Sequence, residues 1–357
     1  MRPAPLPPGP LIHDAAPRNT AALDRARRRR LTLGLALISA ALLLAGLAAG
    51  SEGWSLLALQ GWASPEAQLI VGQIRAPRTL GAWLTGALLG LAGAVAQALF
   101  RNPLADPYLL GSAAGASLGV VLVLAASGLA GHSISLAPAA GLMRVGLVGA
   151  AFAGALAGVF LTLTLARGAE HTTRLLLAGV VVGVMLTALS DLLTTAAPDA
   201  LRGKQAFMLG STSFLGWSSV ALLASGLLLT LPLAWRLARA LDALSLGEDS
   251  AKSLGLALSR WRAVLVAVLA LATGLAVSQA GLVAFVGLVA PHLVRRFAPA
   301  TNGFTLVASA GAGGTLLLAA DVLARTLIAP LELPVGVLTA VLGGGYLLWL
   351  LHRRGFK

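Results

Sequence analysis

The amino-acid sequence predicts an all-α polytopic membrane protein with ten membrane-spanning helices and both termini in the cytoplasm. Of the 357 residues, 57% are hydrophobic and only 11% are charged, whereas soluble domains carry roughly 25% charged residues. The 42 glycines suit membrane helices, whose backbones approach closely at small residues. The apolar residues also gather in long runs, and about 17–25 such residues cross a bilayer as a helix.

The first 30 residues are rich in proline, alanine and arginine, and they have too little apolar surface to fold. We expect residues 1–30 to form a disordered basic cytoplasmic arm and residues 31–357 to form a ten-helix transmembrane permease domain. A cleavable signal peptide is the alternative interpretation. The apolar run after the arm has about 19 residues, which is longer than the usual signal core, so we expect an uncleaved first helix.

Eight apolar runs are long enough to span the bilayer, and they cover residues 31–49, 79–99, 109–128, 145–166, 175–197, 220–237, 304–325 and 335–351. The stretch from residue 263 to 294 has 32 residues without a charge. As one helix it would be about 48 Å long, more than the bilayer core requires. We therefore expect a turn at Ser278, Gln279 and Gly281, which gives one full crossing and a short kinked helix over residues 282–294. Ten membrane segments result.

Lysine and arginine indicate the orientation, because cytoplasmic loops are the basic ones. With the amino terminus inside, twenty of the 26 basic residues lie in inner loops and six in outer loops. This bias predicts cytoplasmic termini and accounts for the net charge of +13. A nucleic-acid partner is not expected, because no basic stretch alternates with stacking aromatic residues. Residues 51–74 are semi-polar and external, with Trp54 and Trp62 as interface anchors.

No pattern in the sequence predicts covalent chemistry, a metal site or a bound cofactor. Cysteine is absent, the five histidines are scattered singly, and no P-loop is present. The glycines near Gly311 and the pair Gly86 and Gly90 are expected to pack helices. Asp321 is the one acid expected deep in a span, and an ion pair with Arg325, four residues later, is its simpler explanation. An ion-coupled secondary transporter therefore stays a weaker alternative.

Polar loop motifs carry the functional signal. One inner loop contains RNPLADP from residue 101, and the largest inner loop contains LGEDSAKSLG from residue 246. In the second motif, Ser245 is expected to cap a short helix, with Glu248 three residues later and Gly255 at its end. Its mixture of acidic and apolar residues suits docking to a soluble partner.

Together with GLVAFVGLVAPHLVR, AADVLAR and ELPVGVLTAVLGG, these motifs resemble, in order and spacing, the FecCD-type permeases of type II ABC importers. The resemblance covers residues 74–351. It implies the type II ABC importer permease fold in the bacterial inner membrane, and a homodimer that works with two cytoplasmic ABC ATPase subunits and a periplasmic substrate-binding protein. ATP and Mg would be bound by the ATPase, so the chain itself would be no enzyme. The sequence departs from the family pattern over residues 298–304 and 343–345.

The resemblance also implies roles for individual residues. ATPase coupling is implied for Leu246, Gly247, Glu248, Asp249, Ala251, Leu254 and Gly255. A cytoplasmic gate is implied for Asn102, Leu104, Thr172 and Thr173. Docking of the binding protein is implied for Arg75, Arg78 and Arg325, for which snorkelling at helix ends is the simpler account. The implied substrate is a bulky metal chelate, with haem or a ferric siderophore expected first and cobalamin (vitamin B12) second.

Overall fold

A computed structural model of the chain describes residues 17–50, 53–54, 64–129, 140–168, 171–253 and 257–353. The described residues are mostly helical, and seven helices are long and apolar enough to cross a membrane. Two shorter apolar helices cover residues 112–128 and 335–350. The predicted all-α membrane class is confirmed at this level. The count of ten spanning helices and the orientation of the termini stay predictions.

Each predicted span corresponds to a helix. The helices that correspond to predicted spans are α1 (Pro17–Ala48), α3 (Ala76–Leu99), α4 (Ser112–Leu129), α5 (Ala140–Leu165), α6 (Thr172–Ala196), α8 (Trp217–Arg236), α11 (Leu258–Ala280), α12 (Val286–Phe297), α13 (Asn302–Thr326) and α14 (Val335–Arg353). The other helices are α2 (Pro65–Ala67), the π-helix η2 (Gln68–Arg75), α7 (Pro198–Leu209), α9 (Ala238–Ser245) and α10 (Glu248–Ser253). Two short strands, β1 (Ala49–Gly50) and β2 (Gly53–Trp54), pair antiparallel.

The first helix begins earlier than the sequence predicts. Because α1 starts at Pro17, residues 17–30 are helical, and the predicted disorder is wrong for this part of the arm. Alanine, leucine and arginine are strong helix formers, so a helix established in the apolar run continues outward through the basic residues. Residues 1–16 lie outside the described part of the chain, and for them the disordered arm stays a prediction.

The described residues directly before the second span, 64–75, are helical from Pro65 onwards. Elements α2, η2 and α3 follow one another without a gap from Pro65 to Leu99. The hydroxyl of Ser64 caps this run by accepting a hydrogen bond from the amide of Ala67 at 3.1 Å. Trp54 is 63% exposed, as an interface anchor requires, whereas Trp62 lies outside the described residues.

The break in the long apolar stretch is present but lies further along the chain than predicted. Helix α11 continues past Ser278 and Gln279, and α12 starts at Val286. Gly281 and Phe285 have φ values of 68° and 67°, and these left-handed conformations reverse the chain. Glycine adopts such angles readily, but phenylalanine rarely does. The second turning point therefore has no signal in the sequence.

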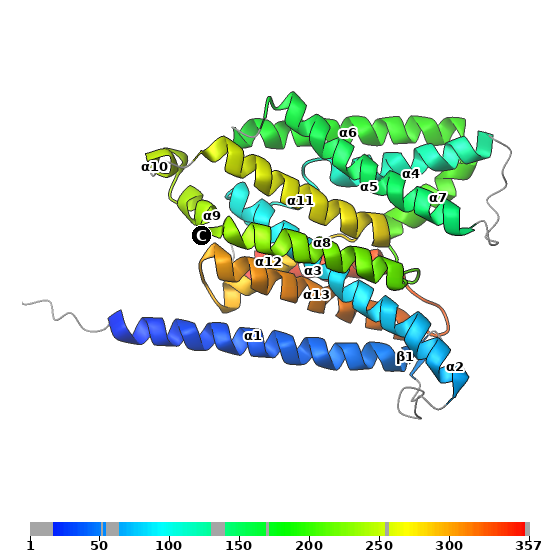
Figure 1. The fold of residues 1–357 in the computed structure, drawn as a ribbon, viewed down its shortest axis with the longest axis horizontal. Coiled ribbons are helices and arrows are strands. Elements are labelled where there is room, and N and C mark those ends of the chain that lie inside the picture. The colour runs from blue at the N-terminus through cyan, green and yellow to red at the C-terminus, as the bar shows by residue number, and fades with distance from the viewer. Residues whose placement is uncertain are drawn as a thin grey trace, which may run out of the picture.

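Helix α3 is the central helix of the bundle and packs against α11, α12 and α13 (Figure 1). Its glycines allow backbones to touch. A β-carbon at Gly93 would lie 1.7 Å from the carbonyl oxygen of Gly287 in α12, and one at Gly90 would lie 2.1 Å from that of Ser309 in α13. At Gly86 the carbonyl of Gly313 would be 2.3 Å away. The predicted packing role of Gly86 and Gly90 is confirmed.

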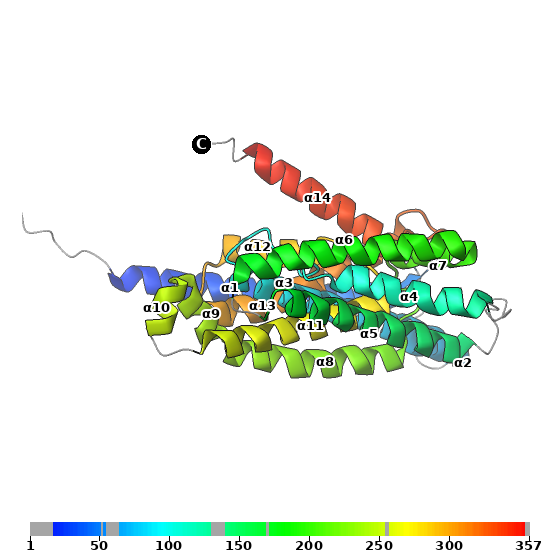
Figure 2. The same cartoon turned by 90° about the horizontal axis from the view of Figure 1, so that it is seen from above.

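The two ends of the bundle carry different elements. Helices α9 and α10 lie at one end, near the start of α1, and we call this the α10 end (Figure 1). Elements α2 and β1 lie at the opposite end, which we call the α2 end. Helix α14 diverges from the bundle towards the carboxyl terminus (Figure 2), although the Tyr346 ring still lies 5.9 Å from that of His292 in α12. Its first turns also pack on the bundle. There Gly336 approaches the carbonyls of Leu209 and Leu282, which would lie 2.4 and 2.5 Å from an added β-carbon.

Candidate functional site

A buried ion cluster joins several segments at the α2 end. Asp321 of α13 is completely buried. One carboxylate oxygen accepts hydrogen bonds from Arg78 Nε of α3 at 3.2 Å and from Thr212 Oγ1 at 2.5 Å. The other oxygen pairs with Arg325, one helical turn later. The ion pair predicted from the spacing of Asp321 and Arg325 is therefore confirmed.

Arg325 is directed into the protein and not towards a partner. It is 1% exposed. Its guanidinium donates hydrogen bonds to the carbonyls of Gly46 at 3.1 Å and Ala49 at 3.4 Å, and to Thr79 Oγ1 at 3.3 Å. These bonds tie the end of α1 to α3 and α13. The expectation that Arg325 docks a soluble protein is therefore corrected for this conformation, because no part of its charge is accessible.

Arg78 has a second carboxylate partner in the loop before α14. Its Nη1 atom donates to Glu332 Oε1 at 2.9 Å, and the Ser213 hydroxyl donates to Glu332 Oε2 at 2.9 Å. The Arg78 and Glu332 side chains are 10% and 26% exposed. Partial burial alone would raise the pKa of Glu332, but the hydrogen bond and charge of Arg78 outweigh it and hold that pKa below its ordinary value. The positive charges of Arg78 and Arg325 thus neutralise the negative charges of Asp321 and Glu332.

Arg75 is the most accessible of the three predicted docking arginines. It ends the π-helix η2 and is half-buried. Its Nη1 atom donates to the carbonyls of Leu47 and Ala48, each at 3.1 Å. These carbonyls belong to the last turn of α1, where a cation stabilises the negative end of the helix dipole.

The predicted ATPase-coupling segment forms a helical hairpin at the α10 end. Gly247 connects α9 and α10 with φ of 112°, a conformation that favours glycine. Leu246 is 70% exposed, whereas Ala251 is buried. The structure describes the backbone of Asp249 but not its side chain, and Leu254 and Gly255 lie outside the described residues.

Glu248 has an intramolecular partner. Its Oε1 atom accepts a hydrogen bond from Arg262 Nη2 of α11 at 2.5 Å, and the two side chains are 30% and 4% exposed. The predicted capping box is wrong, because Ser245 ends α9 and its hydroxyl donates to the Asp242 carbonyl at 2.5 Å. The pair with Arg262 instead holds the first turn of α10 against α11.

Asp242 is a residue that sequence reasoning missed. Its Oδ1 atom accepts hydrogen bonds from the backbone amide and the side-chain amide of Asn302, at 2.9 and 2.8 Å. Asn302 is the first residue of α13, so a carboxylate from α9 satisfies a free amide at the start of that helix. The two residues are 60 positions apart in the chain, and no local pattern signals their contact.

The loop between α3 and α4 is held by its own polar side chains. Asn102 Oδ1 accepts from the amide of Leu104 at 2.9 Å, and Asp106 Oδ1 accepts from the amide of Tyr108 at 2.8 Å. Burial raises the pKa of Asp106, although the bond from Tyr108 acts in the opposite direction. The Tyr108 hydroxyl donates to the carbonyl of Val283 at 3.1 Å, which fastens this loop to the turn between α11 and α12.

The predicted gate residues lie on two adjacent segments. Asn102 and Leu104 are exposed in the loop, with Leu104 at 60%. Thr172 and Thr173 begin α6, and Thr173 is exposed. The segments approach at Gly179 of α6, where an added β-carbon would lie 2.2 Å from the carbonyl of Leu109. The gate function of the four residues stays a prediction.

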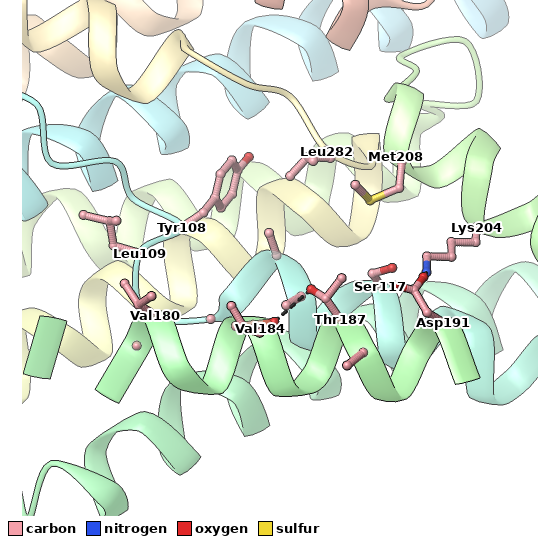
Figure 3. Close-up of a pocket in the computed structure, with 16 residues that line it drawn as sticks. Tyr108, Leu109, Ser117, Val180, Val184, Thr187, Asp191, Lys204, Met208 and Leu282 are labelled. Carbon is pink, nitrogen blue, oxygen red and sulfur yellow. Dashed lines mark hydrogen bonds and ion pairs between the residues drawn. The ribbon is translucent and has the colours of Figure 1, made fainter. Parts of the chain in front are cut away.

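A cavity of about 580 Å³ opens among α4, α6 and α7 (Figure 3). Most of its wall is apolar and includes Tyr108, Leu109, Val180, Val184, Met208 and Leu282. Polar side chains gather at one end, where Asp191 of α6 pairs with Lys204 of α7 close to Ser117 and Thr187. Among the described residues, no group of three or more His, Cys, Asp or Glu side chains is placed to hold a metal ion.

Comparison with known proteins gives one consistent result. Residues 31–353 match the FecCD transport family. The vitamin B12 import system permease proteins BtuC of Klebsiella pneumoniae and Pectobacterium atrosepticum are each 39% identical over 332 residues, which cover 93% and 92% of this chain and 96% of each relative. The BtuC protein of Escherichia coli O139:H28 is 39% identical over 337 residues, 93% of this chain and 99% of its own.

One solved structure is also similar along most of the chain. It is described as an inward-facing conformation of a metal-chelate type ABC transporter, and it covers 91% of this chain and 99% of its own length. The TM-score is 0.79 and the sequence identity is 26%. Sequence and fold comparisons therefore agree over nearly the same residues.

Proposed function

The chain belongs to the FecCD transport family and is an ABC importer permease of the bacterial inner membrane, and from this premise we propose that its substrate is cobalamin. The observation that carries the proposal is the 39% identity, over nearly the whole chain, to permeases named for vitamin B12 import. This proposal reverses the order of candidate substrates that the sequence alone favours. Haem or a ferric siderophore becomes the second candidate, which the likeness to a metal-chelate type transporter keeps open.

The chemistry of the cavity supports a cargo that is recognised through its organic ligand. The wall is mostly apolar, and its polar side chains are confined to one end. Cobalamin encloses its metal in a large ring with neutral amide groups at the rim, so it needs a wide path and no protein ligand. An ion-coupled carrier fits less well, because both oxygens of Asp321 are already bound by Arg78, Thr212 and Arg325.

Uptake measurements test the substrate directly. The protein, reconstituted with its cognate ATPase and binding protein, is expected to accumulate radiolabelled cyanocobalamin in an ATP-dependent manner. Haem and a ferric hydroxamate siderophore are the competing cargoes in parallel assays. Accumulation of either one without cobalamin would overturn the substrate assignment, and accumulation without ATP would favour a secondary transporter.

We also propose the assembly in which this permease works. Two copies form a homodimer, with two ABC ATPase subunits on the cytoplasmic side and a periplasmic binding protein outside. Ten helices span the membrane with both termini inside, which the distribution of basic residues supports. The divergence of α14 from the bundle leaves much of this apolar helix uncovered within one chain (Figure 2), and Val341, Leu342 and Leu348 are 66%, 52% and 69% exposed. This apolar surface suits a second copy.

The docking role is proposed for Arg75 and Arg78 and no longer includes Arg325. Arg75 is accessible enough to meet a carboxylate of the binding protein. Arg78 already binds Glu332, so a partner carboxylate has to take the place of Glu332 to reach it. Arg325 supports the site from within by neutralising Asp321.

The exposed side chain of Leu246 is proposed as an apolar anchor for the ATPase. Leu246→Arg is expected to reduce co-purification of the ATPase about ten-fold, because loss of a central contact typically costs more than about 1 kcal/mol. ATP-driven uptake should fall with it. The matched control is Leu23→Arg in α1, a leucine that is 58% exposed and lies away from α10. Equal binding by both variants would remove Leu246 from the interface.

The pair of Glu248 and Arg262 gives a second test of the same segment. Glu248→Arg places two cations together and should detach α10 from α11, which weakens coupling without direct loss of a contact to the partner. The double variant Glu248→Arg with Arg262→Glu restores the pair in reverse. If Glu248 positions α10, the double variant recovers ATPase binding. If Glu248 itself contacts the ATPase, the double variant stays defective.

A further inference from the structure

Arginines surround the place where α1 passes α12 at the α10 end. Five lie on α1 between residues 25 and 30 and two lie in the last turn of α12, namely Arg25, Arg27, Arg28, Arg29, Arg30, Arg295 and Arg296. The acid on this part of α1 is Asp24, which makes a long, exposed pair with Arg27 at 3.9 Å. A strong excess of positive charge therefore remains on this surface.

An apolar cluster lies beside Arg28 and includes the residue before Arg295. Its buried members are residues of α12 and α13, among them Val294, and Leu31 and Phe304 pack against them. Arg28 precedes Leu31 by about one helical turn, and its guanidinium lies 5.7 Å from the centre of the Phe304 ring. Arg295 is the next residue of α12 after Val294. Helix packing thus brings Arg28 to the rim of this patch, at the end of α12 that carries Arg295.

Both arginines have unused hydrogen-bonding capacity. Arg28 Nε and Arg295 Nη2 are shielded from solvent, and neither has a hydrogen-bond acceptor within the described part of the chain. A shielded N–H group of a cation is costly when it has no acceptor. An anionic oxygen from outside the chain would satisfy both the charge and the unused donors. The rim is therefore suited to a phosphate group.

The position of the patch along the helices indicates where that phosphate comes from. The uninterrupted apolar run of α1 starts directly after Arg30, at residue 31. Trp235 and Phe297 are 58% and 60% exposed at this end of the bundle, and Trp235 lies 3.6 Å from a β-carbon built on Gly303, next to Phe304. Exposed aromatic residues and arginines at helix ends mark the headgroup layer of a bilayer.

We propose that α1, α12 and the start of α13 form a binding site for an anionic phospholipid, with Arg28 and Arg295 contacting the headgroup phosphate and Leu31 and Phe304 contacting its chains. The net negative charge of such a lipid complements the arginine excess, which a zwitterionic lipid does not. The site does not depend on the transported substrate, so it is tested separately from the proposed function.

Lipid binding to the purified full-length protein tests the site. We expect phosphatidylglycerol, added to the protein in detergent, to give lipid-bound species in native mass spectrometry and to raise Tm. Phosphatidylcholine and inorganic phosphate should do neither. Because each arginine near a membrane surface contributes about 1 kcal/mol, Arg28→Gln with Arg295→Gln should weaken phosphatidylglycerol binding about 30-fold. The lysine pair, Arg28→Lys with Arg295→Lys, should keep most of the affinity.

The matched control removes two charges elsewhere at exposed positions, with Arg167→Gln and Arg174→Gln. This control should bind phosphatidylglycerol as the wild type does. Equal weakening in both glutamine pairs would show a general charge effect and overturn the proposal. An equal Tm rise with inorganic phosphate would assign the patch to a free anion, and normal lipid binding with lost ATPase would assign it to a protein contact. Monodisperse elution of each variant confirms that it is folded.

Discussion

Replacement of Asp321 by alanine is expected to lower the free energy of unfolding by about 3–5 kcal/mol, the usual result of breaking a buried ion pair from one side. Asp321 is the acceptor for Arg78, Thr212 and Arg325. Without it, the Arg325 guanidinium, at 1% exposure, keeps its charge with no carboxylate in direct contact. Thermal unfolding of the purified variant in detergent measures the loss as a large drop in Tm.

The control for this prediction is another carboxylate in an ion pair. Asp191 pairs with Lys204, but its side chain is 65% exposed, so Asp191→Ala should cost less than about 1 kcal/mol. The double variant Asp321→Ala with Arg325→Met removes both charges of the buried pair and should be more stable than Asp321→Ala alone. Similar Tm values for Asp321→Ala and Asp191→Ala would contradict the account of a buried, satisfied cluster.

A single methyl group at Gly93 should also prevent normal folding. The new β-carbon would lie 1.7 Å from the carbonyl oxygen of Gly287, and the obstacle is backbone, so no side-chain rotation relieves the collision. The cost should reach or exceed the upper end of the roughly 1–3 kcal/mol usual for overpacking. We expect Gly93→Ala to accumulate poorly in the membrane and to elute as aggregate on size exclusion.

Gly34→Ala is the matched control on the first helix. It makes the same chemical change, but nothing lies within 4 Å of the added β-carbon. Alanine favours helix over glycine by about 1 kcal/mol, so this variant should fold as well as the wild type or slightly better. Opposite effects of the same substitution would demonstrate that contact between helices, and not helix propensity, decides the outcome. A normal yield of Gly93→Ala would disprove the close contact of α3 and α12.

The sequence predicts the helices well because membrane helices have a strong and local signal. Every apolar run corresponds to a helix, and the pair of Asp321 and Arg325 follows from a spacing of one turn. The sequence does not predict the exact start of α12, because Phe285 adopts a left-handed conformation that is rare for phenylalanine. The composition of residues 17–30 predicts disorder, and this is wrong because arginines next to an apolar run extend the helix that the run forms.

The candidate site was only partly predictable, because its contacts join distant parts of the chain. Arg78 and Glu332 are 254 positions apart, and Arg78 and Asp321 are 243 apart. The hydrophobic periodicity of a single segment cannot predict pairs between residues so far apart in the chain. The family resemblance directs Arg78 outward to a soluble partner, whereas the fold supplies Asp321 and Glu332 as carboxylates within the chain. The spacing along α13 predicts only the pair of Asp321 with Arg325. The same limit applies to Asp242, whose partner begins another helix.

The glycine contacts of α3 have a mechanical consequence. Helices that meet through bulky side chains can slide by exchanging rotamers, but backbones in direct contact have no such freedom. Helices α3, α12 and α13 therefore behave as one solid block, further locked at one end by Asp321. A movement that opens and closes a path through this protein has to leave that block intact. Its hinges are expected outside the block, for example at α14, which has few contacts with the other helices.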